Sequence, residues 1–339
     1  MKKIFIAVLA VAALASCSKE QTVNVDKGAV IGFDTFVENS TRAAADITGA
    51  NISNFGVYGS VTNGQGQKGV IFSNQEVRKN DKNLFTYSPA QYWIAGANYE
   101  FVAIAPFDDA KWEYTLPENA TAAETGTISF NNAAAEANQD LIFAHATAET
   151  DADFMANPDK VGFTFNHMLS RVKFEFTNGT VAANNLTFKV TDVVLEDVHS
   201  KGTLAVTDGA VADTWTVGAE TFDKDFGNAG DAAIAATAKA STEHFYLIPT
   251  TETFTVKFNV TLYQAGVKFD TYARTATVTL DMQKGVSYNV TAELDADTTL
   301  DDILKPIEFS VDRIEDWDNG NTLDTDNPAD GEKDVYPLN

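Results

Sequence analysis

Apolar and polar residues alternate along most of the chain, a pattern that is typical of β-strands with one buried face. In "RVKFEF", Val172, Phe174 and Phe176 share one face of such a strand, and charged residues occupy the other. The longer run "TFTVKFNVTLYQ" (253–264) alternates Phe, Val and Leu with Thr, Lys and Asn in the same way. Strands that carry a polar face suit antiparallel sheets that water covers on one side.

The arrangement of these runs predicts the domain organisation. Two alternating runs flank "DMQKG" between Ala276 and Leu294 and predict a hairpin. Helical patterns are few: a short turn near Asn131–Asn138 and an alanine-rich piece at Ala232–Ala240. The polar stretch "TDADFMANPDK" (150–160) separates two strand-rich halves. The sequence therefore predicts an all-β protein of two sandwich domains, at 43–158 and 159–318, followed by an acidic tail at 319–339.

The first 16 residues have the pattern of a secretory signal peptide. Lys2 and Lys3 precede an uncharged apolar run that is too short to cross a bilayer as a helix, which takes about 20 residues. The sequence "LASC" resembles the bacterial lipobox, in which the cysteine becomes the lipidated first residue. We therefore expect residues 1–16 to be removed and Cys17, the one cysteine of the chain, to carry a lipid that holds the protein at the outer membrane. With that thiol acylated, disulfides and thiolate chemistry are excluded.

Charge and motifs exclude several classes of function. The formal net charge of −24 repels phosphates, which argues against a nucleic-acid partner. The motif "GQGQKG" (64–69) fits G-x-G-x-x-G, but strand-like residues follow it where a dinucleotide site needs a helix, so we predict a hairpin loop. No catalytic motif accompanies the scattered histidines His145, His167, His199 and His244. We therefore predict a protein that is not an enzyme and has no catalytic residue, cofactor or metal site.

The stretch "NSTRAAAD" contains Arg42, the first arginine, followed by Ala43. Small and polar neighbours around a basic residue are typical of a protease-accessible loop, although a surface arginine in a simple connector has the same surroundings. A strand candidate, "GAVIGFDTF", lies just upstream of this stretch. Proteolysis after Arg42 would separate that strand from the rest of the chain.

Several segments in order carry a family resemblance. After the leader and Thr41-Arg42-Ala43 come "ISNFGVYG", "PAQYWIAGANYEFVAIAP" (89–106), "FTFNHMLSRVKFEF" (163–176), "FYLIPT", "GVSYNVTAEL" and "IEFSVDRIEDW" (307–317). In this order they resemble a fimbrillin, the Mfa-like type V pilin of Bacteroidetes. The resemblance covers nearly the whole chain beyond the leader. It implies two tandem transthyretin-like sandwiches and a structural, non-enzymatic subunit of a surface fimbria.

The resemblance also implies how such a subunit assembles. An Arg-specific surface protease would cut between Arg42 and Ala43 and release residues 17–42, the tether and first strand, together with the lipid. The opened sheet would then accept a strand from another fimbrial subunit, building filaments that serve adhesion or biofilm formation. The candidates for the donor strand are 307–317 and "DVYPLN" (334–339). The position of the subunit as stalk, tip or anchor stays open.

A second hypothesis is a monomeric surface lipoprotein that binds glycans or another outer-membrane partner. Exposed tryptophans would be its signature, with Trp93, Trp112 and Trp215 as candidates, although tryptophans also fill cores. The acidic oxygens of Asp324, Asp326 and Asp330 do not fit the spacing of a helix-flanked calcium loop, so a solvated tail is the preferred interpretation there.

Overall fold

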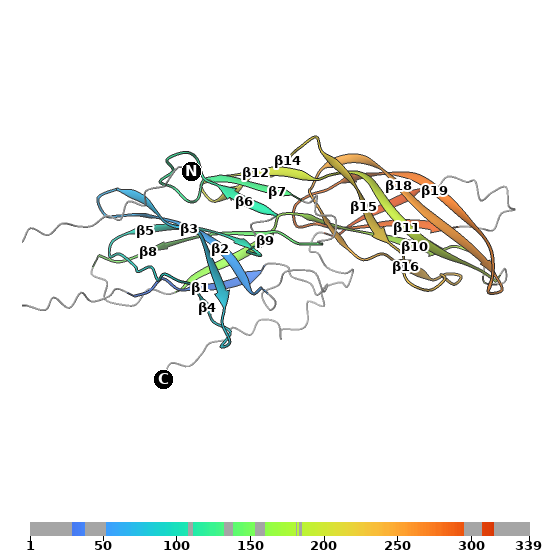
Figure 1. Cartoon of the computed structure of the whole chain (residues 1–339), viewed down its shortest axis with the longest axis horizontal. Coiled ribbons are helices and arrows are strands. Elements are labelled where there is room, and N and C mark those ends of the chain that lie inside the picture. Colours follow the sequence, from blue (N-terminus) through green and yellow to red (C-terminus); the bar gives the residue numbers. More distant parts are fainter. Residues whose placement is uncertain are drawn as a thin grey trace, which may run out of the picture.

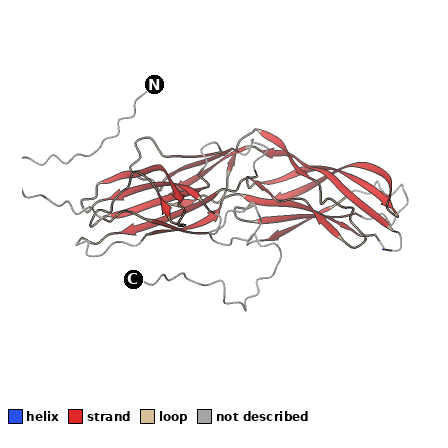
Figure 2. Ribbon diagram, turned by 60° about the horizontal axis from the view of Figure 1, so that its bottom comes forward, coloured by secondary structure: helices blue, strands red, loops and turns tan. Residues whose placement is uncertain are grey.

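The computed structural model describes residues 29–37, 52–107, 111–131, 138–152, 160–180, 182, 185–294 and 307–314. Within these residues the regular secondary structure is almost entirely β-strand and includes no α-helix, so the all-β prediction is confirmed. The strands form two lobes that lie end to end in an elongated molecule (Figures 1 and 2). Consistent with this, we find no membrane-spanning helix in the described part of the chain.

The first lobe consists of two sheets. The larger has seven strands in the order β1 (Phe33–Val37), β9 (Val161–His167), β8 (Ile142–Glu149), β5 (Asn98–Ala105), β2 (Asn54–Thr62), β3 (Lys68–Lys79) and β4 (Phe85–Thr86). The smaller has the order β13 (Ala210–Val211), β12 (Lys201–Thr207), β7 (Gly126–Asn131) and β6 (Trp112–Thr115), with β14 (Thr216–Val217) also paired to β12.

The second lobe is a sandwich of two further sheets. One has the order β16 (Lys239–Ser241), β10 (Ser170–Asn178), β20 (Ser287–Leu294) and β21 (Phe309–Ile314), with β17 (Phe245–Leu247) also paired to β10. The other has the order β15 (Thr221–Gly227), β11 (Leu186–His199), β18 (Thr251–Gln264) and β19 (Val267–Asp281).

Apolar side chains fill three separate cores. One lies between the two sheets of the second lobe and includes Phe174, Phe176 and Phe258. The other two lie on opposite faces of the seven-stranded sheet, around Phe101 on one face and around Ile104 on the other. Because both faces of this sheet are covered, β2 and β5 have nearly continuous buried runs in place of strict alternation.

The seven-stranded sheet curls until its two edges meet. The segment just before β1 pairs with the segment after β4, through an antiparallel bridge between Val30 and Tyr92. The rings of Phe33 on β1 and Tyr87 are also in contact, with centroids 5.5 Å apart. The chain before and in β1 therefore closes a nearly complete barrel around the core that contains Phe33.

Two local expectations are wrong. The alanine-rich piece Ala232–Ala240 forms no helix; Ile234 bridges Phe188 instead, and β16 begins at Lys239. The two runs around "DMQKG" form no hairpin, because β19 pairs with β18 in one sheet while β20 pairs with β10 and β21 in the other. The turn between them therefore crosses from one layer of the sandwich to the other.

The assignment of strands to the two lobes does not change at the predicted domain boundary, 158/159. β9, which begins at Val161, still pairs with β1 and β8 in the first lobe. After β10 and β11 have entered the second lobe, β12 returns and pairs with β7 over six residues, from Lys201↔Asn131 to Val206↔Gly126. Trp215 follows in the same excursion and donates its indole N–H to the carbonyl of Met168 at 2.8 Å. The lobes are therefore interleaved in sequence, and transthyretin-like domains at 43–158 and 159–318 remain a prediction.

Candidate functional site: the groove filled by the first strand

The first strand occupies a groove between two edges of backbone. On one side β1 runs parallel to β9, in register from Phe33↔Val161 to Val37↔Phe165. On the other side the segment before β1 runs antiparallel to Gln91–Trp93. There the N–H of Ile31 donates to the Gln91 carbonyl at 2.9 Å, and the N–H of Trp93 donates to the Ala29 carbonyl at 3.0 Å. This short segment therefore satisfies polar backbone groups on both rims of the groove.

Two side chains of the segment fill the apolar floor of the groove. Ile31 has no exposed surface and Phe33 is 2% exposed. The ring of Phe33 stacks on Phe163, with centroids 5.6 Å apart, and also contacts Phe72 and Phe101 from the central strands. A buried aromatic ring contributes a large part of the stability of such a core, and each ring pair adds about 0.5–1.5 kcal/mol beyond its buried area.

A tyrosine hydroxyl fixes the position of the segment along the groove. Tyr87 Oη donates to the carbonyl of Ile31 at 2.8 Å. Burial raises the pKa of the Tyr87 phenol, so the hydroxyl stays protonated and remains a donor. The polar face of β1 contributes little more, since its ion pair between Asp34 and Lys160, 3.2 Å apart, is half exposed to water.

Removal of the segment would leave a site of defined chemistry. The N–H and C=O groups of β9 and of Gln91–Trp93 would lose their partners, and the aromatic floor would face water. Exposed strand edges of this kind bind an extended peptide, in which backbone hydrogen bonds supply affinity and alternate side chains supply specificity. The groove therefore fits an extended strand with large apolar residues at every second position.

The residues that the sequence predicts for processing are outside the described part of the chain. Cys17, Arg42 and Ala43 all lie there, and so do the predicted signal peptide and the acidic tail at 319–339. The predicted first strand is present, as β1 and the bridge at Val30. The sequence predicts neither the pairing of β1 with β9 nor the second rim at Gln91–Trp93. The apolar stretch in "AQYWIAG" is too short to show a strand period, so it could equally be a loop.

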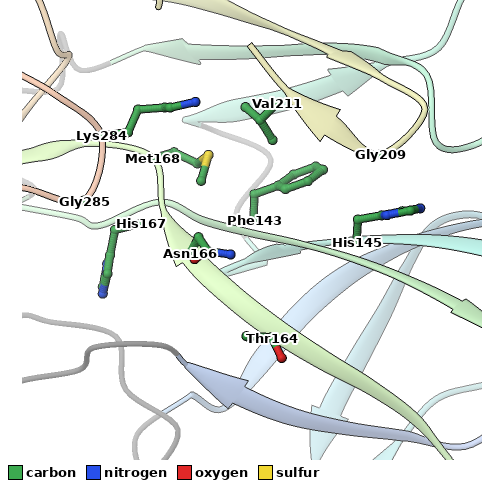
Figure 3. Close-up of a pocket in the computed structure, with 10 residues that line it drawn as sticks. All are labelled: Phe143, His145, Thr164, Asn166, His167, Met168, Gly209, Val211, Lys284 and Gly285. Atoms are coloured by element: carbon green, nitrogen blue, oxygen red, sulfur yellow. The ribbon is translucent and has the colours of Figure 1, made fainter. Parts of the chain in front are cut away.

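The four histidines do not form a common site. His167 is buried with its Nδ1 2.7 Å from Asp140, whereas the half-buried His145 contacts Glu100. These two rings approach one cavity near the lobe junction but point in different directions (Figure 3). The remaining two lie elsewhere: His199 Nε2 is 2.8 Å from Glu252, and His244 lies between β16 and β17. No group of potential metal ligands occurs among the described residues.

The tryptophans that were candidates for a glycan platform fill cores. Trp93 and Trp112 are each 4% exposed, and Trp215 is 7% exposed. A stacking platform for a sugar needs an accessible ring face, so these three side chains cannot provide one. "GQGQKG" (64–69) lies in the hairpin between β2 and β3, where Thr62 pairs with Lys68, as the sequence predicts.

The fold and the groove define an all-β protein whose first strand closes its own first lobe. A family model for fimbrillin-like proteins matches residues 41–317. The chain therefore belongs to the fimbrillin-like family, and the resemblance seen in the sequence is confirmed.

The solved structure of one fimbrial protein shows the same fold. A fimbrial protein from Bacteroides vulgatus ATCC 8482 is 17% identical, covers 84% of this chain and 99% of its own, and superposes with a TM-score of 0.61. The fimbrial anchor protein Mfa2 from Porphyromonas gingivalis is 10% identical, covers 84% of this chain and 97% of its own, and has a TM-score of 0.37. A comparison with curated protein sequences finds no significant match.

Proposed function

We propose that this protein is a structural subunit of a cell-surface fimbria that polymerises by exchange of its first strand. It is exported as a lipoprotein precursor anchored through Cys17, and an Arg-specific surface protease cuts it between Arg42 and Ala43. The segment 17–42 then leaves, and a strand from another subunit takes its place in the groove. The observation that carries the proposal is that Ile31 and Phe33, two core side chains, belong to a segment that a single cut would free.

The positions of the other arginines support cleavage at Arg42. The chain has four more, Arg78, Arg171, Arg274 and Arg313, and each lies in a strand: β3, β10, β19 or β21. Proteases bind substrates in loops that can adapt to their active sites, and paired strands resist them. A protease specific for arginine is therefore expected to prefer "NSTRAAAD", which follows the end of β1.

The structure favours 334–339 over 307–317 as the donor. β21, at the centre of 307–317, pairs with β20 along its whole length, from Phe309↔Ala292 to Ile314↔Ser287. Phe309 also contacts the rings of Phe174 and Phe258 in the core of the second lobe. Donation of this strand would open that core, so we propose 334–339 as the donor.

The sequence of 334–339 matches what the groove holds now. Tyr336 and Leu338 flank Pro337 as Ile31 and Phe33 flank Gly32. A proline has no N–H, but the bond at position 32 uses the carbonyl, which accepts from the N–H of Val161 at 2.8 Å. A Cβ on Gly32 would meet the aliphatic part of the Lys160 side chain, which is flexible and half exposed.

A peptide-exchange experiment tests the proposal. The chain from Ser18 is cut after Arg42, and a synthetic peptide of residues 332–339 is added in excess. We expect the peptide to bind the cut chain with release of fragment 18–42, and not to bind the uncut chain, as measured by native mass spectrometry. The matched control is the same peptide with Tyr336→Asp and Leu338→Asp, which places two carboxylates on the apolar floor. Equal binding of both peptides, or release of the fragment with no binding of either, would contradict the proposal.

A further inference from the structure

The strand β19 has an open edge. Among the described strands it pairs with β18 alone, so the N–H and C=O groups on its other edge have no neighbouring strand there. The Thr271 N–H donates to the carboxylate of Asp270 at 2.8 Å, which indicates that this N–H points away from β18. Two apolar side chains near the start of the strand, Val267 and Phe269, are 71% and 53% exposed. The hairpin of β18 and β19 follows the outside of the second lobe (Figure 1), and an edge of this kind can accept another strand.

Arg274 lies in the middle of this strand, and no carboxylate of the described residues forms an ion pair with it. Its guanidinium carbon is 5.6 Å from the ring centroid of Tyr272, two residues away on the same face. Burial of the side chain lowers the pKa of Arg274. The chain contains 48 Asp and Glu against 24 Lys and Arg, so an arginine without an acidic partner is unexpected. A partly buried cation of this kind is stabilised when another molecule supplies a carboxylate.

Asp270 matches Arg274 in charge but cannot reach it within one copy. The two residues lie on the same face of β19, because their cross-strand neighbours Leu262 and Phe258 are both buried in the core of the second lobe. Four residues of an antiparallel strand separate them by about 14 Å. Tyr272 lies midway between them. When a second copy of the strand runs antiparallel with its Tyr272 opposite the first, each Asp270 faces the Arg274 of the other copy.

We propose that two copies of this protein associate through their β19 edges, antiparallel and centred on Tyr272. The contact contains two equivalent ion pairs between Asp270 and Arg274, with the two Tyr272 rings between them. The Thr271 N–H, which the Asp270 carboxylate caps in the single copy, becomes free to donate to the Ala273 carbonyl of the other copy. Any other register moves Asp270 away from Arg274, and a parallel arrangement in register places like charges opposite each other. The charges on the edge therefore select a second copy of this chain, in a single register.

This contact goes beyond the proposed function and does not depend on it. Its residues lie at 270–274 in the second lobe, and none of them leaves with a cut after Arg42. The contact is isologous, since both copies use the same patch, so it closes on itself and does not extend a filament. In a fimbria it would join two subunits side by side that run in opposite directions.

Reversal and exchange of the two charges test the contact. The uncut chain from Ser18 is used, because its groove is already filled by β1. Arg274→Glu places carboxylates opposite each other in a dimer, and Asp270→Arg places guanidinium groups opposite each other. A mixture of these two variants restores both ion pairs, and so does the double variant Asp270→Arg/Arg274→Glu. The matched control is Lys189→Glu, which changes the net charge as Arg274→Glu does but lies in β11, two strands from the open edge.

Sedimentation velocity at a series of concentrations measures the dissociation constant of the dimer. We expect the unchanged chain and the Lys189→Glu variant to dimerise with the same constant. For Arg274→Glu alone we expect a constant about thirtyfold higher, equivalent to about 2 kcal/mol, because both cross-strand pairs become repulsive. The mixture and the double variant should return close to the value of the unchanged chain.

Two results would overturn the contact: an unchanged chain that stays monomeric at every concentration, or equal constants for Arg274→Glu and Lys189→Glu. Failure of both the mixture and the double variant to dimerise would overturn the pairing of Asp270 with Arg274. Failure of the peptide to enter the groove would overturn strand exchange and leave the sedimentation result valid.

Discussion

Replacing Phe33 by alanine is expected to lower the free energy of unfolding of the first lobe by about 3–5 kcal/mol, the usual cost of truncating a buried phenylalanine. The side chain is 2% exposed and lies among Phe72, Phe101 and Phe163. Its loss opens a cavity at the point where the curled sheet closes. Urea denaturation of the uncut chain, followed by tryptophan fluorescence, measures the change.

Val30→Ala is the matched control for Phe33→Ala. Val30 lies three residues upstream in the same segment but is 49% exposed, so the expected change is within about 0.5 kcal/mol. A large effect of Phe33→Ala and a small effect of Val30→Ala would establish that β1 fills the groove through its buried side chains. Similar small effects would mean that the first strand contributes little to the lobe and that its release has little consequence.

Arg42→Gln is expected to abolish filaments on cells that produce the protein. Without the cut, β1 stays covalently attached and occupies the groove, so a donor strand has to compete with a tethered segment whose effective concentration is in the millimolar range or above. The precursor should then accumulate as a chain that begins at lipidated Cys17. Electron microscopy of the cell surface and immunoblots of membrane fractions measure the two effects.

Arg78→Gln controls for the loss of a positive charge, because Arg78 lies in β3 with its guanidinium beside Glu76. We expect normal filaments in this variant. The variant Arg42→Lys tests the specificity of the protease. An Arg-specific enzyme leaves this variant uncut, whereas an enzyme that also accepts lysine cuts it. Filaments of normal length in the Arg42→Gln variant would contradict cleavage as the trigger of assembly.

Alternation of apolar residues predicts the strands of this protein well, because one-sided burial leaves a direct mark on sequence. β9 and β12 alternate buried and open positions throughout. It does not predict which strand pairs with which. β12 returns to the first lobe because Leu204 and Val206 pack in the same core as Ile128. The alternation in "KGTLAVT" would be the same if β12 paired within any other sheet, so it does not indicate this partner.

The groove was predictable in part for the same reason. "GAVIGFDTF" indicates a strand with Ile31 and Phe33 on one face, and the structure buries both. The sequence contains no comparable sign of the second rim at Gln91–Trp93, because three residues are too few to show a period. Nor does it reveal the curl, which depends on how the whole sheet twists around its aromatic core.

The central claim is that the first strand is a removable part of the fold. Intact mass and N-terminal sequencing of the protein that shear releases from cells test it most directly. The account predicts assemblies of several sizes, in all of which the chain begins at Ala43. Chains that all begin at acylated Cys17 and are monomeric after detergent extraction would contradict it.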